Sequence, residues 1–174
     1  MKASWFFSGP AGGAFTALAT LGPLGTRLPA PGTWGSAAGL LLYSAGLAPF
    51  NNAQRWTVFL GVLLALVLLA IISSAIAEKF LQKKDPGCVI IDEVVAMPLV
   101  FVGLENVMRH AQQPWIWFLL GFGLFRFFDI LKPLGIKQLQ KLPGGLGIVV
   151  DDLAAAAAAG LVLHALHFGI GFLR

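Results

Sequence analysis

Residues 57–77, TVFLGVLLALVLLAIISSAIA, form a stretch of 21 residues without a charged side chain. About 20 apolar residues are enough for a helix to cross the hydrocarbon core of a bilayer, which is about 30 Å thick. Because 57 % of the whole chain is hydrophobic and only 11 % is charged, the composition does not fit a soluble domain of this size. This stretch therefore predicts an all-α integral membrane protein.

Further apolar segments lie on both sides of this stretch. The five predicted spans cover residues 35–50, 57–77, 91–108, 115–131 and 149–173. Residues 1–26 contain one charge, Lys2, and several glycines and prolines, so we expect an interfacial or re-entrant element there. At 174 residues, the chain is predicted to form a single integral membrane domain, a polytopic helical bundle of about five transmembrane helices.

The distribution of basic residues predicts the orientation of this bundle. With a cytoplasmic N-terminus, eight Lys and Arg residues fall on the cytoplasmic side and three fall outside. Cytoplasmic loops carry the excess of such residues, so the prediction is a multi-pass protein with its N-terminus inside and its C-terminus outside. The eight are Lys2, Arg27, Lys79, Lys83, Lys84, Lys132, Lys137 and Lys141; the three are Arg55, Arg109 and Arg174.

Five of the eight carboxylates lie where apolar segments begin or end. Asp92 and Glu93 begin the third predicted span, Asp129 lies near the end of the fourth, and Asp151 and Asp152 begin the last. With the predicted topology, all five lie at the cytoplasmic edge of the bilayer. A carboxylate there is costly unless it faces protein, water or a cation. We therefore expect three helices to bring these acids into one site.

Five carboxylates in one site suit a hard cation such as Mg²⁺, which binds carboxylate oxygens together with substrate phosphate. Arg126 precedes Asp129 by three residues and Lys132 follows it by three, so both cations lie near that acid and could hold a phosphate. A metal could then activate a water as the nucleophile, or one acid could form an aspartyl-phosphate. The single cysteine, Cys88, excludes an internal disulfide.

The same residues also allow purely structural roles and a different function. The acid pairs at residues 92–93 and 151–152 could serve only to stabilise helix N-termini, and Asp129 could only pair with Arg126. A cation- or proton-coupled membrane transporter could also use such a carboxylate cluster. In the glycine-rich segment 31–36, Thr33 or Ser36 could cap a helix, although the composition of this segment and of residues 143–147 is that of ordinary loops.

Four short motifs carry a resemblance to a known family. They are PGTWGS (31–36), IDEVVAM (91–97), FRFFDILKP (125–133) and GGLGIVVDD (144–152). In this order and spacing they resemble the phosphatidylglycerophosphatase A family, over about residues 17 to 165. The chain departs from the family pattern at Ala96, where glycine is usual, and at Leu134-Gly135, where an aromatic residue and proline are usual beside Lys132.

The resemblance implies a Mg²⁺-dependent lipid phosphatase of the bacterial inner (cytoplasmic) membrane, with its active site facing the cytoplasm. It implies hydrolysis of an anionic phospholipid, phosphatidylglycerophosphate, to phosphatidylglycerol and phosphate, with no nucleic-acid partner; the oligomeric state stays open. The implied catalytic residues are Asp92, Glu93, Asp129, Asp151 and Asp152, of which Glu93, Asp129, Asp151 and Asp152 would be metal ligands. The implied phosphate-binding residues are Arg126, Lys132, Thr33 and Ser36.

Overall fold

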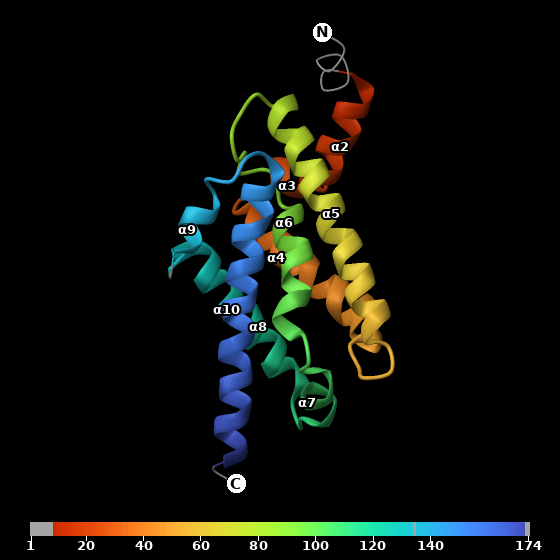
Figure 1. The fold of residues 1–174 in the computed structure, drawn as a ribbon, viewed down its shortest axis with the longest axis vertical. Coiled ribbons are helices and arrows are strands. Elements are labelled where there is room, and N and C mark those ends of the chain that lie inside the picture. Colours follow the sequence, from red (N-terminus) through yellow and green to blue (C-terminus); the bar gives the residue numbers. More distant parts are fainter. Residues whose placement is uncertain (1–8, 134, 173–174) are drawn as a thin grey trace.

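The computed structural model describes residues 9–133 and 135–172, and these form helices and turns without a β-strand. The all-α prediction is therefore confirmed for this part of the chain. Figure 1 shows the helices as an elongated bundle. The elements are α2 (Pro10–Thr20), α3 (Pro23–Arg27), α4 (Pro31–Leu42), the π-helical η1 (Tyr43–Leu47), the 3₁₀-helical η2 (Ala48–Phe50), α5 (Trp56–Phe80), α6 (Ile91–Ala96), the 3₁₀-helical η3 (Met97–Phe101), α7 (Glu105–His110), α8 (Pro114–Leu131), α9 (Ile136–Leu139) and α10 (Gly145–Phe172).

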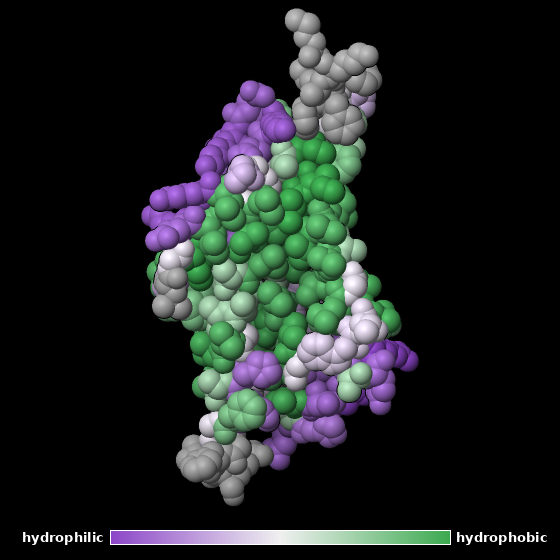
Figure 2. Space-filling model, viewed as in Figure 1, coloured by the Kyte–Doolittle hydropathy of each residue, from purple (hydrophilic) through white to green (hydrophobic). Residues whose placement is uncertain are grey.

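Three helices of the described chain are long and apolar enough to cross a membrane, not the five that the sequence predicted. They are Trp56–Phe80, Pro114–Leu131 and Gly145–Gly169. These helices match the predicted spans 57–77, 115–131 and 149–173, although residue 173 lies outside the described residues. On the face drawn in Figure 2, apolar side chains form a belt between two polar ends. This surface fits a protein that is surrounded by lipid around its middle.

The predicted span 91–108 is instead a broken segment inside the bundle. Helix α6 has six residues, and η3 continues it with Pro98 near its start. Proline lacks an amide hydrogen, so it interrupts the α-helical ladder, and Gly103 at φ +76° then turns the chain. Most side chains of α6 and η3 are buried in the protein. Irregular backbone at membrane depth is tolerated when protein covers it.

The predicted span 35–50 is also interrupted. Helix α4 ends at Leu42, and η1 and η2 continue the chain with π and 3₁₀ geometry, with Pro49 in η2. The buried Asn51 amide then donates to Tyr43 Oη at 2.9 Å and to Phe101 O at 2.7 Å, and its oxygen accepts from Gly103 N at 3.2 Å. Asn51 therefore ties the end of η2 to the end of η3.

The predicted N-terminal element contains two short helices, α2 and α3, while its first residues, 1–8, lie outside the described residues. Helix α2 has 11 residues, so it is about 17 Å long and too short to cross a bilayer. It packs against α5. Helix α3 lies against the segment before α6, because a Cβ at Gly25 would overlap Cys88 O.

Candidate active site

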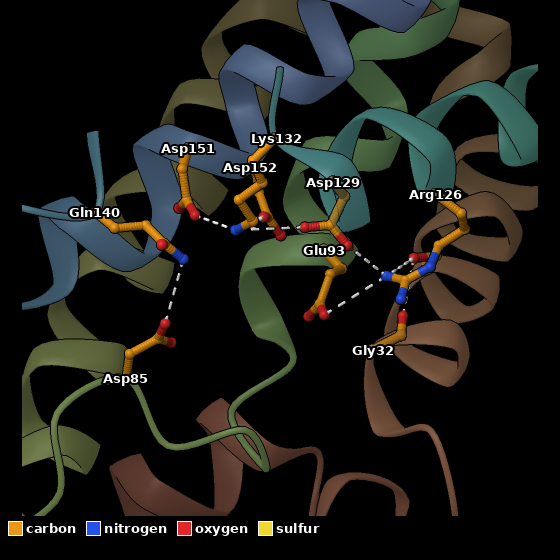
Figure 3. A network of polar contacts seen from close by, with 10 residues as sticks. Gly32, Asp85, Glu93, Arg126, Asp129, Lys132, Gln140, Asp151 and Asp152 are labelled. Carbon is orange, nitrogen blue, oxygen red and sulfur yellow. Dashed lines mark hydrogen bonds and ion pairs between the residues drawn. The ribbon is translucent and has the colours of Figure 1, made fainter. Parts of the chain in front are cut away.

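The five acids singled out from the sequence converge where α6 and α10 begin and α8 ends. Figure 3 shows Glu93, Asp129, Asp151 and Asp152 near one another, and an oxygen of Asp92 lies within 4.8 Å of oxygens of Glu93 and Asp152. Asp92 and Glu93 come from α6, Asp129 from α8, and Asp151 and Asp152 from α10. Each of the five is at most 9 % exposed. Buried carboxylates need positive partners or a bound cation.

Three of these acids form a group with the geometry of a metal site. One carboxylate oxygen each from Asp92, Glu93 and Asp152 lies within 4.8 Å of the others. Asp92 Oδ1, Glu93 Oε2 and Asp152 Oδ2 are buried and have no hydrogen-bond partner. Such orphaned oxygens are costly in a protein interior. A hard divalent cation would satisfy them, so these residues fit the metal that the resemblance implies.

The electrostatics of α6 agree with this fit. Burial raises the pKa of the Asp92 carboxyl well above its ordinary value, and the charges of Glu93 and Asp152 raise it further. Burial likewise raises the pKa of Glu93, although a hydrogen bond from Asp92 opposes that rise. Both shifts mean that burial disfavours the ionised carboxylates when no counter-charge is near. A bound cation would favour the ionised forms.

The other two acids are already paired with cations. Arg126 Nη1 donates to Asp129 Oδ2 at 2.7 Å and lies 3.8 Å from Glu93 Oε1. Lys132 Nζ donates to Asp151 and lies 3.6 Å from Asp129 Oδ1 and 3.8 Å from Asp152 Oδ1. Burial lowers the pKa of Lys132, but these carboxylates outweigh burial and raise it overall, so the ammonium stays charged.

The side chains of the two cations are more exposed than those of the acids. The side chains of Arg126 and Lys132 are 17 % and 18 % exposed, whereas those of Asp151 and Asp152 are 2 % and 4 % exposed. Lys132 reaches this position from the left-handed backbone conformation that ends α8, at φ +44°. Two positions depart from the family pattern near the site. Leu134 lies outside the described residues, and Ala96, which replaces a glycine, is fully buried.

Helix α4 forms one wall of the site through a face of glycines. A Cβ at Gly32 would overlap Glu93 Oε1 and lie 3.1 Å from Arg126 Nη1; one at Gly35 would lie 3.1 Å from Glu93 Oε2. At Gly39, a Cβ would lie 2.6 Å from both Met97 Cβ and Val94 O. These glycines allow the α4 backbone to approach α6 closely, as small residues do between membrane helices.

The glycine-rich segments are therefore helical, and the expectation of ordinary loops is wrong for most of their residues. Residues 31–36 form the first turns of α4, and Gly145 and Gly147 lie in the first turn of α10, preceded by Gly144 at φ +60°. A Cβ at Gly145 would lie 2.8 Å from Ala75 N, so α10 packs closely on α5. The spacing of Gly32, Gly35 and Gly39 on one helical face was the available sequence signal.

The two hydroxyl residues of α4 have different surroundings. Ser36 is fully buried; its Oγ donates to Gly32 O at 2.8 Å and accepts from Arg126 Nη1 at 3.2 Å. Thr33 is exposed in the first turn of α4, where its backbone amide donates to Ala30 O at 2.9 Å. Ser36 is thus joined directly to the ionic network, and Thr33 is on the outer side of the helix.

Comparisons with known proteins agree with the resemblance in the motifs. A family model described as Phosphatidylglycerophosphatase A matches residues 17–167. Phosphatidylglycerophosphatase A of Haemophilus influenzae is 35 % identical over 147 residues, which cover 80 % of each chain. A Bacteroides thetaiotaomicron protein, provisionally named a phosphatidylinositol-3-phosphatase, is 31 % identical over 148 residues, 82 % of this chain and 86 % of that protein. Phosphatidylglycerophosphatase A of Escherichia coli is 26 % identical over 147 residues, 82 % of this chain and 78 % of that protein. No solved structure gives a significant match.

Proposed function

The chain belongs to the phosphatidylglycerophosphatase A family, and we propose that it hydrolyses phosphatidylglycerophosphate to phosphatidylglycerol and phosphate with the help of Mg²⁺. Membership makes it a phosphoric monoester hydrolase that acts on a phospholipid. The observation that carries the finer proposal is the site itself, where four buried carboxylate oxygens have no partner and two cations, which are more exposed, lie close to the same acids. The buried carboxylates suit a metal ion, and the more exposed cations suit a phosphate.

We assign the metal to Asp92, Glu93 and Asp152. The resemblance implied Glu93, Asp129, Asp151 and Asp152, but Asp129 and Asp151 each bind a cation of the protein. Asp151 nevertheless keeps one buried oxygen, Oδ1, without a partner, so it stands as a fourth candidate ligand. When bound, a divalent cation neutralises phosphate oxygens and makes a water more acidic.

We assign the phosphate to Arg126 and Lys132. Both side chains are charged and partly exposed, and each keeps N–H donors, beyond those that bind the carboxylates, for a phosphate oxygen. Their pairing with Asp129 and Asp151 holds them in place before the substrate arrives, which reduces the entropy that binding costs. Asp129 lies between the two cations and would either accept a proton from the attacking water or attack phosphorus itself.

We place this reaction at the cytoplasmic face of the bacterial inner membrane. The loop after α5 carries Lys83 and Lys84, and the segment around α9 carries Lys137 and Lys141, all near the end of the bundle that holds the acids. Each such cation attracts an anionic membrane surface by about 1 kcal/mol. The lipid tails would remain in the bilayer while the terminal phosphate reaches Arg126 and Lys132.

Phosphate release from phosphatidylglycerophosphate in detergent micelles tests the proposal, with Mg²⁺ or EDTA. We expect Mg²⁺-dependent release by the wild type and a loss of at least ~100-fold in Asp92→Asn, because changing even an outer-shell partner of a metal ligand typically costs about 10- to 100-fold. Glu105→Gln is the matched control: Glu105 is also buried and paired with an arginine, Arg109, but it lies on α7. Its activity should match the wild type.

Two outcomes would contradict the proposal. A folded wild type that releases no phosphate, but carries cations across liposome membranes, would favour the transporter alternative. Release that continues at full rate in EDTA would exclude the metal. Phosphatidylinositol-3-phosphate, offered in the same micelles, tests the headgroup: we expect slower release than from phosphatidylglycerophosphate, and a preference for the inositol lipid would reassign the substrate.

A further inference from the structure

We propose that Ser36 is a positioning residue for Arg126, and that it directs one edge of the guanidinium toward the substrate phosphate. The resemblance placed Ser36 among the phosphate ligands. In the structure its side chain is fully buried behind Arg126, so it acts on the phosphate through the arginine. The inference rests on the proposed function and deepens it.

The hydroxyl of Ser36 has a fixed orientation. Its hydrogen is donated to Gly32 O, one helical turn earlier, at 2.8 Å. A hydroxyl has one hydrogen and two lone pairs, so the oxygen is left as an acceptor, and it accepts from Arg126 Nη1 at 3.2 Å. The helix backbone therefore sets the polarity of this contact, and Ser36 keeps no hydrogen for a ligand.

The two hydrogen bonds that the Arg126 side chain donates to Asp129 and Ser36 come from the same nitrogen. Asp129 Oδ2 accepts from Nη1 at 2.7 Å and Ser36 Oγ accepts from Nη1 at 3.2 Å, which uses both hydrogens of that nitrogen. Nε, by contrast, is buried without a hydrogen-bond partner. The Nε–Nη2 edge of a guanidinium is one of the pairs of parallel donors that match a phosphate. Ser36 and Asp129 together leave this edge for the substrate.

Gly32 lets the α4 backbone lie close to the guanidinium of Arg126. A Cβ there would lie 3.1 Å from Nη1 and 3.3 Å from Nη2 of Arg126, so the α4 backbone limits the rotation of the guanidinium from one side. Ser36 limits it from the same helix, one turn further on. Without the hydroxyl, only Asp129 would hold Nη1, and the guanidinium could turn about that single contact.

Steady-state kinetics of Ser36→Ala test the inference, with Ser73→Ala as the control. Ser73 is also fully buried and also donates to the carbonyl four residues earlier, Leu69 O at 2.8 Å, but its hydrogen bonds are to α5 backbone. We expect Ser36→Ala to lower kcat/KM about tenfold, mainly through KM, since a hydrogen bond to a charged group has about this effect. The Mg²⁺ concentration for half-maximal activity should stay within about twofold of the wild type, and Ser73→Ala should change neither quantity.

A double-mutant cycle with Arg126→Lys separates positioning from general packing. Lysine keeps the charge but has no fork to orient, so Ser36→Ala should cost less than about twofold in that background. Full additivity of the two substitutions would overturn the inference. An equal loss of Mg²⁺ response and substrate response in Ser36→Ala would also overturn it, because it would indicate displacement of α4 from Glu93.

Binding of inorganic phosphate to the Mg²⁺-loaded protein distinguishes this inference from the proposed function. A wild type that releases no phosphate from the lipid would contradict the proposed function, yet about tenfold weaker phosphate binding by Ser36→Ala would still support positioning. Phosphate binding that is equal in the wild type, Ser36→Ala and Ser73→Ala would overturn the positioning role, whatever the lipid assay shows.

Discussion

At the scale of single residues, the site separates acids that accept a hydrogen bond from a cation from acids that do not. Asp129 and Asp151 are held by Arg126 and Lys132, whereas oxygens of Asp92, Glu93 and Asp152 have no partner. Removing a hydrogen-bonded acid takes the nearest carboxylate away from a partly buried cation, while removing one of the other acids relieves repulsion between like charges. The two kinds of acid should therefore respond oppositely in the metal-free protein.

Asp152→Asn is the substitution that shows this difference most directly. In EDTA we expect a higher apparent melting temperature than that of the wild type, by about 2–4 °C for each 1 kcal/mol of repulsion removed, because Asp152 lies within 4.8 Å of Asp92 and Glu93. Added Mg²⁺ should raise the melting temperature of the wild type more than that of the variant. Thermal unfolding in detergent, with and without the metal, measures both effects.

Asp129→Asn provides the contrasting case. It weakens the partner of Arg126 at 2.7 Å, so its melting temperature should fall in EDTA as well as in Mg²⁺. A metal-free Asp152→Asn protein that is less stable than the wild type would contradict the separation into two kinds of acid.

The convergence of these acids and the pairing of Asp129 with Arg126 could be expected from the sequence, but the hydrogen bond from Lys132 to Asp151 could not. Each acid lies at the end of an apolar segment, and alternating helices bring such ends together. Whether Arg126 binds Asp129 or Glu93 depends on side-chain distances, 2.7 Å against 3.8 Å. The first distance follows from the spacing of three residues on α8, whereas the second depends on how α8 and α6 lie relative to each other, which spacing along the chain does not reveal.

At the scale of elements, the sequence predicted the lipid-facing helices better than the buried ones. Helices α5 and α8 begin and end within a few residues of their predicted bounds, because an uninterrupted apolar run has few alternatives in a membrane. Segment 91–108 is equally apolar, but its neighbours are other helices: α6 packs against α4, α5 and α10. Hydropathy alone does not distinguish a neighbouring lipid from a neighbouring helix.

The packing of α4 on α6 is the element contact on which the site most depends. Gly39→Ala should separate these helices, since the new Cβ would lie 2.6 Å from Met97 Cβ and Val94 O and 3.0 Å from Glu93 O. We expect destabilisation by about 1–3 kcal/mol and a loss of activity with it. Gly61→Ala is the control, because a Cβ at this exposed position of α5 meets no atom within 4 Å.

Melting temperature and phosphate release, measured on both alanine variants, test this packing. Gly61→Ala should retain wild-type activity and equal or slightly higher stability, because alanine favours a helix more than glycine. If Gly39→Ala behaved like Gly61→Ala in both assays, the close approach of α4 to α6 would not be needed for the site.

At the scale of the whole molecule, one segment runs along the bundle without forming a candidate membrane span. In Figure 1, α5 ends near the site and α8 begins at the opposite end, so residues 81–113 run the length of the bundle between them. They do so through α6 and η3, inside the protein. Helices α5 and α8 therefore run in one direction along the bundle and α10 in the other, as the five-span prediction required.

This arrangement makes the orientation testable with two exposed positions, Lys83 beyond α5 and Gln112 before α8. In a Cys88→Ala background, Lys83→Cys and Gln112→Cys each give one thiol for a membrane-impermeant reagent. We expect Lys83→Cys to be labelled in inside-out vesicles only and Gln112→Cys in intact spheroplasts only, because loops rich in Lys and Arg stay cytoplasmic. Mass spectrometry of the purified variants measures the labelled fraction.

The reverse labelling pattern would place the acids on the outer face, where the lipid substrate would first have to cross the bilayer. Labelling of both positions from one side would mean that residues 81–113 do not connect two faces of the membrane. The expected pattern would put the end of α8, which carries Arg126 and Lys132, at the cytoplasmic leaflet, because α8 ends on the side of the bundle that holds the loop after α5 (Figure 1). The orientation of one loop thus fixes the leaflet from which this site can take a lipid.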